Sequence, residues 1–317
     1  MKQPYVVGID IGGTHSVFGI VNKQGEILAQ SKIMTRGHED FEAYLDALHK
    51  GVTELIAATI PDGELVGIGV GAPAVNHDGE ISGSADLPWR GPIPLSQKIS
   101  KKFGVAARAA NDANAAAIGE KAYGAGKGMD NFIVITLGTG VGSGIVSDGH
   151  LIWGHRGLAG ELGHVIRKPG GRQCGCGRKG CLETYCAARG IVTTACELLD
   201  ASDEFSLLRG MPREEITPAA ISIAAGKGDE LSKRVFEITG EILGEACADF
   251  AACTAPEAII VFGGIAKAGD LLLEPMRKAF EKNLLFIYKD AVKILRSELP
   301  EGDAAVLGAS ALGWEAI

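Results

Sequence analysis

The sequence lacks an excess of basic residues, a long apolar run and a leader-like start. Its 317 residues carry 31 Lys and Arg against 39 Asp and Glu, a formal net charge of −8. An acidic chain without a basic stripe is a poor candidate for nucleic-acid binding. No apolar run approaches the roughly 20 residues that span a bilayer, and Asp10 comes too early for a signal peptide. We therefore expect a cytoplasmic protein that binds neither nucleic acid nor a membrane.

Two common phosphate-binding motifs are missing as well. The sequence contains neither the GxxxxGK[ST] loop nor a GxGxxG run directly after its first predicted strand. Any phosphate site is therefore neither a P-loop nor a dinucleotide fingerprint.

What is present is enough apolar sequence for a core, with glycine concentrated in short clusters. Hydrophobic residues make up 46% and charged residues 22%, so a sizeable core is available and the composition disfavours wholesale disorder. The length is comfortable for two domains. Many of the 45 glycines lie beside apolar runs, a distribution typical of backbone turns at ligand sites rather than of flexible linkers.

One pattern of strands and turns occurs twice. Strands are expected at residues 5–9, 16–21 and 26–33, with the turn Asp10-Ile11-Gly12-Gly13-Thr14 after the first and a hairpin turn at 22–25. Strands at 132–137 and 143–146 repeat this arrangement around Gly138-Thr139-Gly140, with a hairpin turn at 147–149. Two copies separated by a domain's length indicate an internally duplicated fold.

Helical patterns alternate with these strands. The spacing of apolar residues predicts helices over 41–59, 112–123 and 235–250, the last ending before Pro256, and strands over 65–70 and 257–262. The last strand runs into Gly263-Gly264, with a helix beyond. Alternation of this kind predicts α/β layers with ligand sites at the carboxyl edges of the sheets.

Three glycine turns follow three of the predicted strands and form candidate phosphate contacts. They comprise Asp10, Gly12, Gly13 and Thr14; Gly138, Thr139 and Gly140; and Gly263 and Gly264. Glycine lets backbone N–H groups approach a phosphate closely. Asp10 is a candidate Mg²⁺ ligand, and Thr14 and Thr139 are candidate hydroxyl donors. Taken singly, each turn has a plainer interpretation, because glycine after a strand and a turn-capping aspartate are common in any fold.

A compact set of soft ligands lies in the middle of the chain. His164, Cys174, Cys176 and Cys181 follow the spacing His-x9-Cys-x-Cys-x4-Cys within 18 residues. Four such ligands satisfy tetrahedral zinc, and a closed set of three Cys and one His indicates a structural ion rather than a hydrolytic one. The alternative is a coincidence of core cysteines, which the surrounding Gly, Arg and Lys disfavour. The remaining cysteines, Cys186, Cys196, Cys247 and Cys253, have apolar neighbours and are expected in the core.

Together these motifs resemble the ROK family (repressors, ORFs, kinases). The resemblance rests on Asp10-x-Gly-Gly-Thr14, Asn111-Asp112, Gly138-Thr139-Gly140, Gly160-Glu161-x-Gly-His164, the Cys-Gly-Cys-Gly to Gly-Cys-Leu-Glu183 run and Gly263-Gly264, and it covers essentially the whole chain. It implies an actin-like ATPase fold (ribonuclease H-like), with two duplicated α/β lobes and a cleft between them. We expect residues 1–115 to form the N-terminal lobe, joined by a returning C-terminal helix at 302–317, and residues 116–301 the C-terminal lobe with its zinc-binding loop.

The same resemblance implies roles for single residues. It implies that Asp112 is the catalytic base for a sugar hydroxyl. Further sugar contacts are implied for Asn111, Glu161, His164 and Glu183. Zinc on His164 and the three cysteines, ATP with Mg²⁺ in the glycine turns, and homodimers or homotetramers are implied as well. From the residues alone, the favoured interpretation of Asp112 is a helix cap, and that of Glu161 and Glu183 is solvated surface charge.

Three functions compete on this sequence. An ATP-dependent hexose kinase comes first, with glucose the leading sugar and N-acetylmannosamine, N-acetylglucosamine, mannose or fructose behind it. A ROK sugar sensor that regulates transcription comes second, and only nine residues precede Asp10, too few for a DNA-binding domain. A non-kinase ATPase comes third, since it has no need of the zinc segment. Two departures from the family pattern bear on the sugar: Pro73-Ala74 replaces Pro-Gly, and Ala85-Asp86-Leu87 replaces Pro-Asn-Leu.

Overall fold

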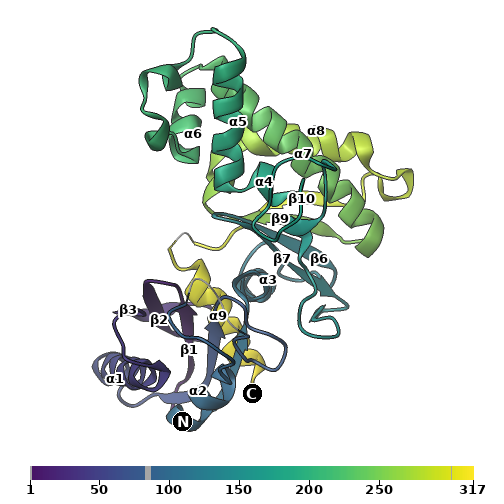
Figure 1. The fold of residues 1–317 in the computed structure, drawn as a ribbon. Coiled ribbons are helices and arrows are strands. Elements are labelled where there is room, and N and C mark those ends of the chain that lie inside the picture. Colours follow the sequence, from purple (N-terminus) through teal and green to yellow (C-terminus); the bar gives the residue numbers. More distant parts are fainter. Residues whose placement is uncertain (1, 83–86, 301) are drawn as a thin grey trace.

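The chain folds into two lobes with two helices, α3 and α9, between them (Figure 1). The computed structural model describes residues 2–82, 87–300 and 302–317; Ala85 and Asp86 therefore lie outside the described residues. Each lobe is built on one five-stranded sheet. Both chain termini lie on the first lobe (Figure 1). Among the described residues, no helix combines the length and the apolar character needed to traverse a bilayer.

The first sheet has the order β3-β2-β1-β4-β5. Its strands are β1 (Pro4–Ile11), β2 (His15–Val21), β3 (Ile27–Met34), β4 (Glu64–Gly71) and β5 (Ala106–Ala110). Strands β1, β2 and β3 form an antiparallel meander, while β4 runs parallel to β1 and β5 parallel to β4. The carboxyl ends of the three parallel strands therefore share one edge, which carries Asp10, Gly71 and Ala110.

The second sheet repeats this topology strand for strand. Its strands are β6 (Phe132–Leu137), β7 (Val141–Ser147), β8 (His150–Leu151), β9 (Ala258–Phe262) and β10 (Lys293–Arg296), in the order β10-β9-β6-β7-β8. Here β6, β7 and β8 are the antiparallel meander, and β9 and β10 are the added parallel strands. The predicted duplication of one strand–turn–strand unit is therefore confirmed, and it extends to the whole sheet.

Helices fill the connections. They are α1 (Phe41–Thr59), α2 (Leu95–Phe103), α3 (Asp112–Tyr123), α4 (Glu183–Cys186), α5 (Ala188–Ala201), α6 (Pro218–Gly226), α7 (Glu230–Thr254), α8 (Asp270–Asn283) and α9 (Ala304–Glu315). Helix α1 begins where Asp40 accepts a hydrogen bond from the Ala43 amide, and it buries the apolar face of Phe41, Tyr44, Leu45, Leu48 and Val52. The long connection between β8 and β9 holds the cysteine segment and α4 to α7.

Helices α3 and α9 each pack on the sheet of the other lobe, not on the sheet whose last strand precedes them. Helix α3 follows β5 of the first sheet but packs on β6 and β7 of the second, whereas α9 follows β10 of the second sheet and packs on β1 and β4 of the first. The two helices also pack on each other, and a Cβ atom at Gly119 would lie 2.8 Å from the Cα of Gly308. The predicted lobe boundary at residue 115 thus falls within α3.

One expectation about the cysteines is wrong. Cys186 and Cys247 are buried as expected and Cys196 is half-buried, but Cys253 is exposed. It lies in the last turn of α7, on the side facing solvent, while Phe250 and Ala251 just before it are buried. The apolar residues next to Cys253 in the sequence do not indicate which side of the helix faces solvent.

Candidate active site

A cavity of about 510 Å³ lies where the two lobes meet. The first lobe contributes Pro73, Ala74 and Val75 after β4, and residues 111–113 after β5. The second lobe contributes the turn between β6 and β7 and the turn after β9. Of the residues predicted for the site, the cavity brings together Asn111, Asp112, Gly138, Thr139, Gly140, Glu161, Gly263 and Gly264.

Asn111 and Asp112 lie at the junction of β5 and α3. The Asn111 side chain is the N-cap of α3, with its Oδ1 accepting a hydrogen bond from the Asn114 amide at 2.7 Å. Asp112, the first residue of the helix, is exposed and lines the cavity. Asn111 is therefore the N-cap of α3, and Asp112 lines the cavity at the positive end of the helix.

Glu161 and His164 belong to the segment that follows a tight turn at Gly160. Gly160 has φ of 88°, a backbone conformation that favours glycine. Its carbonyl oxygen accepts a hydrogen bond from the Ser143 hydroxyl, which in turn accepts one from the Leu162 amide at 3.2 Å. Ser143 on β7 also lines the cavity. Sequence reasoning missed this residue, because a serine in a strand carries no signal until its partner is known.

His164 connects the cavity to the cysteine cluster. Its Nε2 lies 4.0 Å from Glu161 Oε2, and its Nδ1 lies 3.6 Å from Cys174 Sγ. The two ring nitrogens therefore face different partners, the cavity-lining carboxylate on one side and the cluster on the other. His164 itself does not belong to the cavity lining.

The four predicted metal ligands converge. The ligand atoms of His164, Cys174, Cys176 and Cys181 all lie within 4.8 Å of one another, and the Sγ atoms of Cys176 and Cys181 are 3.6 Å apart. Zinc with Zn–S distances of about 2.3 Å would hold tetrahedral ligands roughly 3.8 Å apart, so the cluster fits that ion.

The cysteine environments are consistent with a cation. A backbone hydrogen bond from Arg178 lowers the pKa of Cys176 to about 6, whereas burial raises the pKa of Cys181 to about 12. A buried thiol of that kind is deprotonated at neutral pH only when a cation compensates the charge. The donor set is closed, with three sulfurs and one nitrogen.

Glu183 faces the turn between β6 and β7 rather than the cavity. Its Oε2 accepts a hydrogen bond from the Val141 amide at 3.1 Å, and it is absent from the cavity lining. The turn itself contributes Gly138, Thr139 and Gly140 to the cavity.

The turn after β1 lies outside the cavity lining, so Asp10, Gly12, Gly13 and Thr14 do not contact this space in the structure. Asp10, next to the last residue of β1, pairs with Gly71 of β4, and a Cβ atom at Gly71 would lie 3.8 Å from its Oδ1. Burial raises the pKa of Asp10 to about 6. A carboxylate that is costly to ionise without a partner suits a cation site.

The turn after β9 separates two spaces. Gly263, with φ of 105°, is packed so tightly on β6 that a Cβ atom would collide with the Leu137 carbonyl oxygen. Together with Phe262 and Gly264 it lines both the main cavity and a second cavity of about 320 Å³ at the carboxyl ends of β9 and β10. One elongated ligand could therefore cross this turn.

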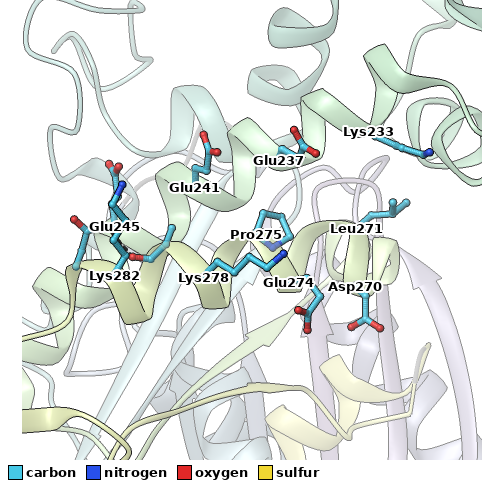
Figure 2. A pocket seen from close by; sticks show the side chains of 12 residues that line it. Lys233, Glu237, Glu241, Glu245, Asp270, Leu271, Glu274, Pro275, Lys278 and Lys282 are labelled. Atoms are coloured by element: carbon cyan, nitrogen blue, oxygen red, sulfur yellow. Dashed lines mark hydrogen bonds between the residues drawn. The ribbon is translucent and has the colours of Figure 1, made fainter.

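A further cavity of about 700 Å³ lies away from the lobe junction. It is a groove between α7 and α8 whose walls carry charged side chains, among them Glu237, Glu241, Lys278 and Lys282 (Figure 2). No residue predicted for the site lines it. Among the described residues of its walls, none belongs to a glycine turn that could hold a phosphate, and the charges are of both signs.

Comparison with known proteins agrees with the geometry. A family model described as "ROK family" matches residues 6–315. The chain belongs to the ROK family. A glucokinase of Halalkalibacterium halodurans is 36% identical over 99% of this chain and 95% of its own length. A crystal structure of a ROK glucokinase from Streptomyces griseus, in complex with glucose and AMPPNP, matches with a TM-score of 0.79 and 33% identity over 98% of this chain and 99% of that one.

The ROK family also includes regulators. A crystal structure described as a ROK family transcriptional regulator matches with a TM-score of 0.87 and 27% identity, over 98% of this chain and 77% of the regulator. Fold similarity alone therefore does not separate kinase from regulator. The actin-like ATPase fold expected from the motifs is shown by the duplicated sheets together with these sugar-kinase neighbours.

Proposed function

We propose that this ROK protein is an ATP-dependent hexose kinase that transfers the γ-phosphoryl group of Mg·ATP to glucose, giving glucose 6-phosphate. One observation carries the proposal: a single cavity at the lobe junction holds Asp112, Glu161 and two glycine turns. Its near full-length similarity to glucokinases, and to a structure holding glucose and an ATP analogue, supports the same activity.

Asp112 is the proposed catalytic base. It lines the same cavity as the 138–140 turn, where a sugar hydroxyl and a terminal phosphate would meet. The carboxylate would accept the proton of the attacking hydroxyl as the phosphoryl group transfers. Phosphoryl transfer depends more on positioning and charge stabilisation than on a strong base, so an ordinary carboxylate suffices.

The nucleotide would extend across the turn after β9. The 138–140 turn offers backbone N–H groups to the phosphates, and the second cavity, beyond Gly263 and Gly264, has room for the adenosine. Asp10 and the Gly12, Gly13 and Thr14 turn would approach the phosphates when the lobes close, with Mg²⁺ bound to Asp10 directly or through water.

The sugar would lie between the first lobe and the Glu161 segment. Glu161 accepts hydroxyl hydrogen bonds and Asn111 offers both a donor and an acceptor. His164 would hold a structural Zn²⁺ ion with Cys174, Cys176 and Cys181, because the donor set is closed and the spacing fits. Such an ion supplies rigidity to the segment, and the second ring nitrogen of His164 remains available to the Glu161 side.

A coupled ADP-release assay over a panel of hexoses tests this function. Glucose should stimulate ADP release by the wild type, and Asp112→Asn should lower kcat by at least about a hundredfold. Absence of stimulation by any hexose would contradict the kinase assignment, and full turnover by Asp112→Asn would contradict the base. N-acetylmannosamine, N-acetylglucosamine, mannose and fructose belong in the panel as alternative substrates.

Three further properties are proposed with the activity. Elemental analysis of purified protein should find about one zinc ion per chain, and a value far below one would reject the ligand set. A cytoplasmic location follows from the use of ATP. The homodimer or homotetramer implied by the family resemblance stays a prediction, which sedimentation analysis can test.

A further inference from the structure

The turn between β6 and β7, residues 138–141, is hydrogen-bonded at both ends to one short segment of the second lobe. The Ala188 amide donates a hydrogen bond to the Gly138 carbonyl oxygen at 2.9 Å. At the other end, the Val141 amide donates to Glu183 Oε2 at 3.1 Å. The segment 183–188 therefore supports the 138–141 turn from behind, while the turn presents its other side to the cavity.

The same segment continues directly from the cysteine cluster. Cys181, a ligand of the cluster, is followed by Leu182, whose amide donates to the Val165 carbonyl oxygen at 2.9 Å. The Thr184 amide donates back to the Cys181 carbonyl oxygen at 3.0 Å. The other carboxylate oxygen of Glu183, Oε1, lies 3.7 Å from Cys174 Sγ. Glu183 thus contacts the cluster with one oxygen and the turn with the other.

Gly140 shows how closely the carboxylate lies against the turn. A Cβ atom at this residue would come within 2.6 Å of Glu183 Oε2, nearer than real Cβ atoms approach an oxygen. The φ of Gly140 is not in the left-handed region, so what its missing side chain provides is room for the carboxylate, which an added methyl group would push aside. A charged acceptor makes the Val141 hydrogen bond stronger than a neutral one would.

From these contacts we infer that Glu183 is a positioning residue for the nucleotide. It holds the 138–141 turn in the shape that presents the Thr139 and Gly140 amides to phosphate, since the Gly138 and Val141 amides donate to the Gly140 carbonyl oxygen and to Glu183 itself. It also makes that shape depend on the His164–Cys174–Cys176–Cys181 cluster. The inference rests on the proposed function, which places phosphate at this turn. It differs from the sugar contact that the family resemblance implies for Glu183, because it acts on the nucleotide when no sugar is present.

Calorimetric titration with a non-hydrolysable ATP analogue and Mg²⁺, without sugar, separates the two roles. Glu183→Ala should weaken nucleotide binding about tenfold, because the Val141 amide loses its acceptor. Glu183→Gln keeps an acceptor oxygen and should bind within about threefold of the wild type. Glu237→Ala, in the charged groove between α7 and α8 and outside the lining of both proposed ligand cavities, is the matched control and should leave nucleotide affinity unchanged. Equal affinity in Glu183→Ala and the wild type would overturn the inference.

A double-mutant cycle provides a second test. It compares the effect of one substitution in two backgrounds, so a general loss of stability in a single variant does not decide the result. Gly140→Ala should weaken nucleotide binding in the wild-type background, since the new methyl group displaces the carboxylate. In the Glu183→Ala background the same change should cost much less, because the oxygen it meets is gone. Strictly additive effects would contradict direct contact between the carboxylate and the turn.

Metal removal tests the connection to the cluster. After chelation, hydrogen exchange at the 138–141 amides should speed up and nucleotide affinity should fall, and both should recover when Zn²⁺ is restored. Unchanged exchange and affinity in the metal-free, folded protein would refute the coupling. A wild type that binds no nucleotide at all would instead contradict the proposed function, so the two failures are distinguishable.

Discussion

Ala74 adopts a backbone conformation that alanine normally avoids, at the edge of the cavity. Its φ is 57°, and it lines the cavity beside Pro73 and Val75. A left-handed alanine costs roughly 1–2 kcal/mol, and such residues concentrate at functional sites. The departure from the family's Pro-Gly pattern therefore has a structural cost at the place where the sugar would bind.

We expect Ala74→Gly to raise the free energy of unfolding by about 0.5–1 kcal/mol, because relief of the left-handed conformation outweighs the added entropy of the unfolded chain. Chemical denaturation measures it. Ala255→Gly is a matched control, since Ala255 has φ of 46° at the end of α7, remote from the cavity. Both variants should be stabilised, but only Ala74→Gly should change the ratio of kcat/KM between glucose and bulkier hexoses. An identical ratio in both would show that the methyl group plays no part in selection.

Asp10 gives the folded protein a dependence on pH. Burial raises its pKa from 3.8 to about 6, so the folded state binds the proton more tightly than the unfolded state does. The stability contributed by the protonated carboxyl is complete below pH 4 and is lost as the pH rises through 6. The difference corresponds to about 3 kcal/mol.

Asp10→Asn removes this titration, and we expect it to be more stable than the wild type at pH 7 without Mg²⁺, while the two are similar at pH 4. Denaturation curves at both pH values, in chelator, measure the difference. The variant should also lose most of its Mg·ATP affinity, because an amide does not replace the carboxylate at the cation. If the stability difference were the same at pH 4 and pH 7, the raised pKa would be wrong.

At the scale of elements, strongly patterned segments were predictable and weakly patterned ones were not. Helix α1 has the bounds that its apolar spacing predicted, and the paired hairpins around the two glycine turns are confirmed. Strand β5 was missed, because its sequence AARAA has no β-branched or aromatic residue. Strand β10 was missed as well, since four residues are too few to show alternation.

The candidate site divides in the same way. The cysteine cluster was predictable because its four residues lie close in sequence and their chemistry is restrictive. The contact between Glu183 and Val141 was not, because it joins residues that are distant in sequence through a backbone amide. Backbone partners carry no sequence signal of their own.

The packing of α9 on the first sheet depends on glycines in the strands. A Cβ atom at Gly69 of β4 would collide with the Ala309 carbonyl oxygen of α9. We expect Gly69→Ala to lower the free energy of unfolding by about 2–3 kcal/mol, because neither backbone can yield without separating helix from sheet. Gly71→Ala on the same strand is the control, since its nearest neighbour would be the Ala115 Cβ at 3.6 Å, an ordinary contact. Equal destabilisation of the two variants in thermal melts would refute this packing account.

At the scale of the whole molecule, the lobes touch at one edge of the cleft. The ring of His77 on the first lobe meets the ring of Trp153 on the second at 5.6 Å between centroids, nearly perpendicular. The Arg108 guanidinium lies 5.5 Å from the same Trp153 ring and pairs with Glu315 of α9 at 2.9 Å. Two chain crossings, before α3 and before α9, join the lobes covalently. The two crossings are therefore the candidate hinge, and the Trp153 ring bridges the lobes beside it.

Sugar binding should close this hinge further, because the turn that contains Thr14 lies outside the cavity lining, yet the proposed chemistry requires it near the phosphates. Small-angle scattering with saturating glucose should show a smaller radius of gyration than without sugar. Trp153→Ala removes the ring that His77 and Arg108 contact, so its sugar-free form should be more open and its compaction larger, whereas Trp153→Phe should resemble the wild type. Closure excludes water from the transferring phosphoryl group, so Trp153→Ala should also hydrolyse more ATP per sugar phosphorylated. A radius of gyration unchanged by glucose in all three proteins would mean that the cleft is already closed and that Asp10 and Thr14 act elsewhere.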